Sequence, residues 1–172
     1  MKLGRPSLLL FAAIFGLTVY VQAQAKPDFS GTWIFNPQKS SLKVPPPSSM
    51  TLEIEQKDPD VSFSRKQVYG DQSFDWKLQA VTDGQKDVVQ EGPGYTTHSR
   101  VYWQGNAMVI DSQITASDGT KVSDLVTYNL ADGGKTLEAV ERQTTAGGKG
   151  SATNKWVYEK KTAISGLRPN LN

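Results

Sequence analysis

The sequence contains no cysteine and only one histidine among its 172 residues. No disulfide can support the fold, and no thiol is available for nucleophilic or redox chemistry. A Ser-His-Asp mechanism would have to pass through His98, and a zinc ion would need carboxylates for its remaining ligands. We therefore predict no catalytic residues, no metal site and no cofactor, and the composition favours a non-enzymatic role.

The chain also lacks an excess of charge of either sign once its first 25 residues are set aside. These residues hold two of the 19 basic groups, Lys2 and Arg5, and none of the 17 acidic groups, so that the remainder carries 17 of each. A neutral chain has no electrostatic footprint for nucleic acid or for an anionic membrane. No nucleic-acid partner is expected.

The first 25 residues have the pattern of a signal peptide. A basic start, an apolar run and small residues suited to cleavage follow one another in the order that such segments require: Lys2 and Arg5, then Leu8 to Val21, then Ala23 and Ala25. The apolar run is shorter than the roughly 20 residues that usually span a bilayer. We expect cleavage before Lys26 and a periplasmic or secreted product without a stable membrane anchor, since no cysteine is present to carry a lipid.

A helical period is missing from the chain between Phe29 and Lys160. Short segments of alternating polarity, separated by turns rich in glycine, asparagine and aspartate, take its place. About ten such segments follow one another with short connections. This pattern predicts an all-β fold, a single up-and-down antiparallel barrel of about eight to ten strands over residues 26–161, with a flexible tail over residues 162–172.

The opening Gly31-Thr32-Trp33, with Asn36, Lys39 and Ser40 behind it and a closing strand over residues 156–160, resembles that of exported bacterial lipocalin-like proteins of unassigned function. More distantly, the chain is similar to the calycins, which include the lipocalins and the fatty-acid-binding proteins and hold small apolar molecules inside a barrel. The resemblance implies a lipocalin or fatty-acid-binding-protein-like barrel in which Gly31 bends the first strand and Trp33 plugs one end. It also implies a basic residue over the Trp33 indole; Arg142 is the first candidate and Lys155 the second.

Polar residues share alternation faces with apolar residues in two segments, which makes them candidates for the barrel interior. Arg65 lies on the face of Phe63, and Asp124 lies on the face of Tyr128. A buried arginine is costly unless it is paired, so Arg65 either meets Asp124 or a similar acid or awaits an anionic ligand group. A slip of one residue would instead turn Arg65 outward.

Aromatic side chains with a few polar anchors are typical of ligand cavities, although the same residues would also fill a solid barrel. In segment 97–104 the faces His98-Arg100-Tyr102 and Ser99-Val101-Trp103 are almost equal in polarity, so the sequence does not decide which of the two points inward. The candidate ligand-binding residues are Phe63, Arg65, Trp76, Arg100, Tyr102 and Tyr128.

The sequence thus favours a soluble exported protein that binds a small apolar or amphipathic ligand inside the barrel. The alternative is a protein-interaction or inhibitor module that uses the barrel loops. An internal cavity would support the first function, and a solid barrel with exposed apolar loops would support the second.

Overall fold

The computed structural model of the protein describes residues 25–147 and 150–162. Apart from residues 25 and 162, the predicted signal peptide and the predicted tail lie outside this part. The elements are β1 (Gly31–Phe35), β2 (Ser49–Lys57), β3 (Asp60–Tyr69), β4 (Gln72–Val81), β5 (Val88–Gly92), β6 (Tyr95–Gln104), β7 (Ala107–Ala116), β8 (Lys121–Ala131), the short 3-10 helix η1 (Asp132–Gly134), β9 (Thr136–Thr145) and β10 (Ser151–Lys160). Among these residues, no helix has the length and apolar character that crossing a membrane requires.

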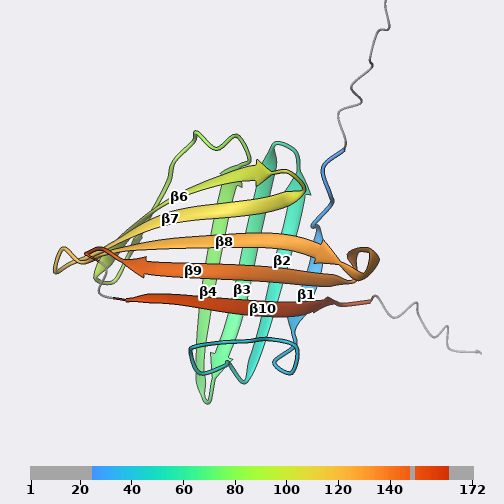
Figure 1. The fold of residues 1–172 in the computed structure, drawn as a ribbon, viewed down its shortest axis with the longest axis horizontal. Helices are drawn as coiled ribbons and strands as arrows, with labels where there is room; N and C mark the ends of the chain where they lie inside the picture. The colour runs from blue at the N-terminus through green and yellow to red at the C-terminus, as the bar shows by residue number, and fades with distance from the viewer. Residues whose placement is uncertain (1–24, 148–149, 163–172) are drawn as a thin grey trace, which may run out of the picture.

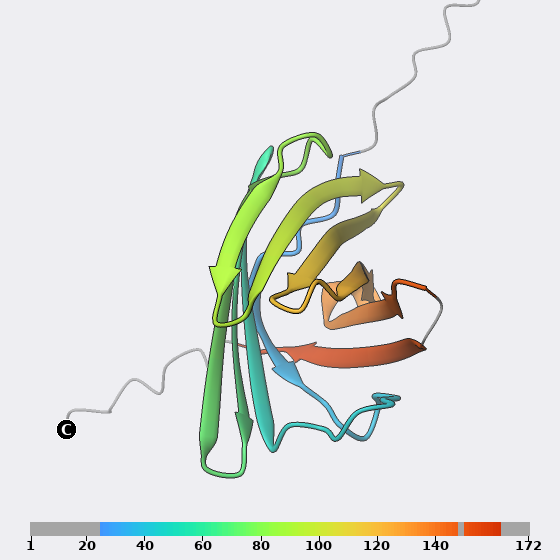
Figure 2. The ribbon, with the colours of Figure 1, turned by 90° about the vertical axis from the view of Figure 1, so that its left-hand side faces the viewer.

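The strands form one antiparallel sheet that curls into a nearly closed barrel. Their order in the sheet is β4-β3-β2-β1-β10-β9-β8-β7-β6-β5, so strands that follow one another in sequence pair, except β4 and β5, and β1 also pairs with β10. In Figure 1 the blue-to-green strands β1 to β4 run across the yellow-to-red strands β6 to β10, and Figure 2 shows the strands following one another around the interior. The prediction of an all-β up-and-down barrel is confirmed.

The barrel has one seam, between β4 and β5, where the sheet begins and ends. The two edge strands do not form a ladder across it. The side-chain amide of Gln90 donates a hydrogen bond of 2.6 Å to the carbonyl of Lys77 and so joins the edges at one point.

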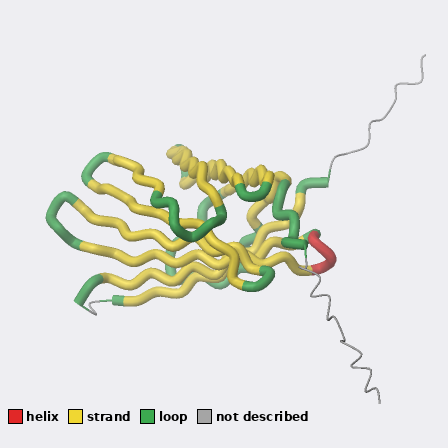
Figure 3. The backbone as a smooth tube through the Cα atoms, turned by 90° about the horizontal axis from the view of Figure 1, so that it is seen from above, coloured by secondary structure: helices red, strands yellow, loops and turns green. Residues whose placement is uncertain are grey.

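Tight turns connect the successive antiparallel strands. The turns after β3 and β6 contain Gly70 and Gly105, with φ of 57° and 62°. Residues with a Cβ rarely adopt such angles, so glycine suits both positions. Seen from above in Figure 3, the loops gather at the ends of the strands, and η1 is the one helical turn drawn in the described part.

An apolar core fills one end of the barrel. Trp33 is fully buried, as are its register partner Leu52 and the nearby Phe29. The indole N–H of Trp33 donates a hydrogen bond of 3.0 Å to the carbonyl of Phe29, which satisfies the one polar atom of this side chain. The Gly-x-Trp segment thus places its tryptophan inside the barrel.

The basic residue over Trp33 is Lys160, which corrects the prediction of Arg142 or Lys155. The Lys160 ammonium nitrogen lies 5.1 Å from the centroid of the Trp33 ring. Arg142 is exposed on the outside of β9, and Lys155 forms an ion pair of 2.8 Å with Glu138. The pairing of β1 with β10 sets Trp33 opposite Lys160 and leaves the other two cations elsewhere.

Candidate functional site

The inner face of the first half of the barrel carries Arg65. The strand register aligns Leu52 of β2 with Arg65 of β3 and Trp76 of β4. Because aligned residues in a sheet point to the same face, Arg65 and Trp76 lie on the inner side with the buried Leu52. The structure therefore places Arg65 inside the barrel, without the slip that would have turned it outward.

The second half of the barrel contributes a polar row to the same interior. The register aligns Ser99 of β6, Ser112 of β7, Asp124 of β8 and Gln143 of β9. Ser99 and Ser112 are buried, and their hydroxyl oxygens lie 2.8 Å apart within one hydrogen bond. The inward face of β6 is therefore Ser99-Val101-Trp103.

This orientation corrects the prediction that Arg100 and Tyr102 bind the ligand, because both lie on the outer face of β6. The Arg100 side chain is 57% exposed, and its Nε atom lies 3.8 Å from a carboxylate oxygen of Asp87. Tyr102 forms an isolated β-bridge with Asp83, in the connection between β4 and β5. Neither residue lines the interior.

A cavity of 320 Å³ lies between the two halves, near the lower end of the size range of small-molecule sites. Its wall combines apolar, hydroxyl, amide and charged side chains, all from β3, β4 and β6 to β9. The lining residues are Arg65, Trp76, Tyr95, Thr97, Ser99, Ile110, Ser112, Ile114, Asp124, Val126, Tyr128, Glu141 and Gln143. Tyr95 is 46% exposed, so the cavity reaches the surface beside it.

Arg65 and Asp124 bring opposite charges to this cavity without pairing. The Arg65 guanidinium lies 5.1 Å from the centroid of the Trp76 ring, in a cation–π contact. In the described part of the chain, the buried Arg65 Nε and the buried Asp124 Oδ1 have no hydrogen-bond partner, and no ion pair links the two residues. Unpartnered polar atoms in a buried site are costly. The wall of the cavity therefore contains one unpaired donor atom and one unpaired acceptor atom.

Burial, and to a smaller extent the nearby Glu141 carboxylate, raise the pKa of Asp124 to about 6. The Gln143 side chain and the Arg65 charge act against this shift, but more weakly. Burial likewise raises the pKa of Tyr128 to about 12, so its hydroxyl remains protonated at neutral pH. Asp124 is thus the group in the cavity wall whose charge changes near neutrality.

Glu141 is a member of the site that sequence reasoning missed. Its carboxylate accepts hydrogen bonds from the Asn154 amide at 2.8 Å, the Trp156 indole at 2.9 Å and the Gln143 amide at 3.4 Å. The signal was present, because Glu141 and Gln143 continue the alternation face of the buried Leu137 and Ala139. Because acidic residues are scattered along the whole sequence, Glu141 is easily taken for a solvent-exposed acid unless the alternation of buried residues along β9 is considered.

Phe63 and Tyr128 support the cavity from the apolar end. Their rings stack with centroids 5.6 Å apart, and Phe63 also lies 6.3 Å from Trp76. Phe63 is buried but does not line the cavity, whereas Trp76 and Tyr128 do. Of the predicted ligand-binding residues, the structure brings Arg65, Trp76 and Tyr128 together at the cavity and places Phe63 directly behind them.

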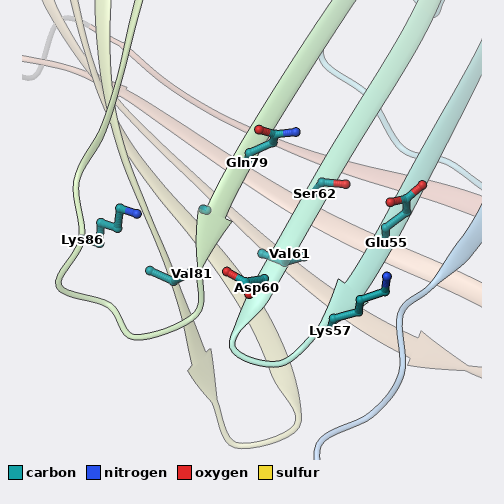
Figure 4. A pocket seen from close by; sticks show the side chains of 9 residues that line it. Glu55, Lys57, Asp60, Val61, Ser62, Gln79, Val81 and Lys86 are labelled. Carbon is teal, nitrogen blue, oxygen red and sulfur yellow. The ribbon is translucent and has the colours of Figure 1, made fainter.

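The hollows on the outside are less suited to holding a ligand. One, of 700 Å³, has a mostly polar lining from β2, β3, β4 and β5. Figure 4 shows another, of 430 Å³, where side chains of β2, β3 and β4 and Lys86 surround a surface depression. Its acids Glu55 and Asp60 and its bases Lys57 and Lys86 are exposed and balance in number. Charges in solvent need no ligand to satisfy them.

A further outer hollow surrounds His98, whose Nδ1 lies 2.6 Å from a carboxylate oxygen of Asp87. Its remaining lining residues are Arg100, Asp111 and Gln113. No hydroxyl group stands among these residues, so the pair lacks the nucleophile that a triad mechanism needs. Among the described residues, no group of three or more histidine, aspartate or glutamate side chains is arranged to hold a metal ion.

The fold is that of a lipocalin or fatty-acid-binding-protein-like β-barrel. No family model matches the chain, and no curated protein matches it in sequence. The likeness to known proteins is therefore one of three-dimensional structure.

Solved structures share this fold at low sequence identity. Secretory abundant heat soluble protein 4 from Ramazzottius varieornatus superposes with a TM-score of 0.51 and 15% identity over 82% of this chain and 99% of that chain. Another secretory abundant heat soluble protein from the same organism gives 0.53 and 12% over 77% and 94%. A point mutant of the fluorescent protein UnaG gives 0.51 and 18% over 78% and 97%. Identities this low show a common fold only.

Proposed function

We propose that the protein holds a small amphipathic molecule in the cavity inside the barrel. The observation that carries this proposal is the 320 Å³ interior cavity, whose wall includes a free donor atom on Arg65 and a free acceptor atom on Asp124. A solid barrel would have favoured the interaction module instead. The likeness to other barrels of this class supports the fold on which the proposal depends.

Binding would combine apolar contact with a polar anchor. Trp76, Ile110 and Val126 give the cavity an apolar wall. Arg65 offers a charged donor to an acid or another acceptor group, an interaction of about 1.5 to 3 kcal/mol. This division of roles is the usual one in small-molecule sites.

A titration with anilinonaphthalene sulfonate tests the proposal, since this fluorescent probe has apolar rings, a sulfonate acceptor and an N–H donor. We expect saturable binding by the native protein. Val126→Phe places a ring in the cavity and should weaken binding about tenfold or more. Asn129→Phe adds the same ring on the exposed outer face of β8 and should leave binding unchanged.

Denaturant unfolding of each variant establishes that it is folded, because the probe also binds exposed apolar surface of partly folded chains. Absence of saturable binding by the native protein would contradict the proposal. Equal affinity in the native protein and a folded Val126→Phe variant would place the probe outside the cavity and also contradict it.

We also propose that the protein is exported and released as a periplasmic or secreted product after loss of residues 1–25. The support is the order of basic, apolar and small residues in that segment. Expression of the full chain in a bacterial host, followed by mass spectrometry of the exported protein, tests this. A mature chain that begins at Lys26 is expected, and retention of residues 1–25 would refute the proposal.

A further inference from the structure

The cavity presents two unsatisfied groups of opposite charge rather than a single anchor. Its charged lining residues are Arg65, Asp124 and Glu141. Glu141 is already occupied, since three side chains donate hydrogen bonds to its carboxylate. Arg65 Nε and Asp124 Oδ1 remain without partners although both atoms are buried.

A ligand with one charge would pair with only one of these two groups. A simple anion, such as a fatty acid, would pair with Arg65 but would bring a further negative charge beside Asp124 and Glu141. A simple cation would pair with Asp124 and leave Arg65 unpartnered. Leaving a buried charge unpaired costs far more than a surface charge does. Single-sign ligands are therefore disfavoured.

We propose that the cavity is built for a small zwitterion with an apolar body, whose anionic group binds Arg65 and whose cationic group binds Asp124. This inference rests on the proposed function, because it assumes that the cavity is the binding site. The apolar body would contact Trp76, Ile110 and Val126. The molecule must be small, because the volume of 320 Å³ lies near the lower limit for such sites.

Three compounds with the same indole ring separate the possibilities by calorimetric titration. Tryptophan carries both charges, N-acetyltryptophan carries only the negative charge, and tryptamine carries only the positive charge. A pH of about 7.5 is suitable, because Asp124 has a pKa of about 6 and is then ionised. We expect tryptophan to bind at least about tenfold more tightly than either single-charge compound, on the scale of one charge-assisted hydrogen bond.

Charge-removing variants assign each end of the ligand. Asp124→Asn should lower the affinity for tryptophan at least about tenfold and should not lower the affinity for N-acetyltryptophan. Arg65→Gln should lower the affinity for both compounds alike. The matched controls are Asp111→Asn and Arg100→Gln, which make the same changes at paired positions on the outer face of β7 and β6. Both controls should leave every affinity unchanged.

The outcomes separate this inference from the proposed function. If N-acetyltryptophan binds as tightly as tryptophan, or if Asp124→Asn leaves the ratio of the two affinities unchanged, the inference of a zwitterionic ligand is overturned. If none of the three compounds binds while anilinonaphthalene sulfonate binds and Val126→Phe blocks its binding, the inference of a zwitterionic ligand is overturned and the proposed binding function stands. If the sulfonate also fails to bind, both proposals fall.

Discussion

Lys160 lies over Trp33 because Gly31 leaves room for it. The Lys160 ammonium nitrogen is 5.1 Å from the centroid of the Trp33 ring, and a Cβ at position 31 would stand 2.7 Å from Lys160 Cε. Gly31 also has a φ of 143°, which residues with a side chain rarely adopt. The contact between the Lys160 cation and the indole ring is thus made possible by the absence of a side chain at position 31, two residues before Trp33 in β1.

Replacing Trp33 with alanine should destabilise the protein by about 3 to 5 kcal/mol, the usual cost of deleting a large buried aromatic side chain. Ile34→Ala is the matched control, because Ile34 is the next residue in β1, faces outward and is 40% exposed. Denaturant unfolding measures both free energies. A loss below about 1 kcal/mol for Trp33→Ala would be that of an ordinary surface substitution and would contradict the role assigned to this residue.

Gly31→Ala should cost about 1 to 3 kcal/mol, because alanine is strained at the φ of position 31. A double-mutant cycle with Lys160→Ala separates this strain from the clash with the lysine side chain. Since Lys160 is flexible and exposed, we expect most of the cost to remain in the Lys160→Ala background. Full recovery there would show that the clash, and not the backbone, is responsible.

Asp124→Asn should alter how stability depends on pH. Burial and Glu141 raise the pKa of Asp124 from its ordinary 3.8 to about 6, against the opposing effects of Gln143 and Arg65. The folded state therefore holds this proton more tightly than the unfolded state does. The native protein should lose stability as pH rises from about 4 to about 6, by on the order of 2 kcal/mol from this group.

The Asp124→Asn variant lacks that loss and should gain stability relative to the native protein over the same range. Denaturant unfolding at a series of pH values measures the difference, with Asp111→Asn on the outer face of β7 as the control. Parallel pH profiles for the native protein and Asp124→Asn would mean that the aspartate carries no such penalty.

The seam should be visible in amide hydrogen exchange. Strand β1 has a partner on both sides, whereas β4 has a partner on one side only. Backbone amides of β4 that point away from β3 should therefore exchange much faster than those of β1. Gln90→Ala removes the hydrogen bond to the Lys77 carbonyl and should speed exchange at the seam further. Uniform protection across β4 would be inconsistent with an unpaired edge.

The sequence predicted those parts of the structure for which local alternation is strong. In β3, the apolar residues Val61 and Phe63 share a face with Arg65, and this pattern correctly indicated an inward arginine. In β6 the two faces are nearly equal in polarity, so nothing local distinguished Arg100 from Ser99. The register with β7, which buries Ser99 against Ser112, decides the orientation there.

Contacts between distant strands were beyond local reasoning. Lys160 lies over Trp33 because β1 pairs with β10 in one particular register, and no spacing within the chain reveals that register. The cavity lined by Arg65 and Asp124 could not be predicted from local sequence either, since a cavity depends on how the two halves of the barrel approach each other. Polarity on a strand face indicates which side chains point inward, but not whether they touch.

Eight of the nine strand pairings join strands that follow one another in the chain, and the ninth joins β1 to β10. The entropy lost in closing a loop grows with its length, so hairpins form more readily than contacts between chain ends. We expect β1 and β10 to meet late in folding, after the hairpins have formed. Interactions that form after the transition state slow unfolding without speeding folding. The lifetime of the folded state is then controlled by its two terminal strands.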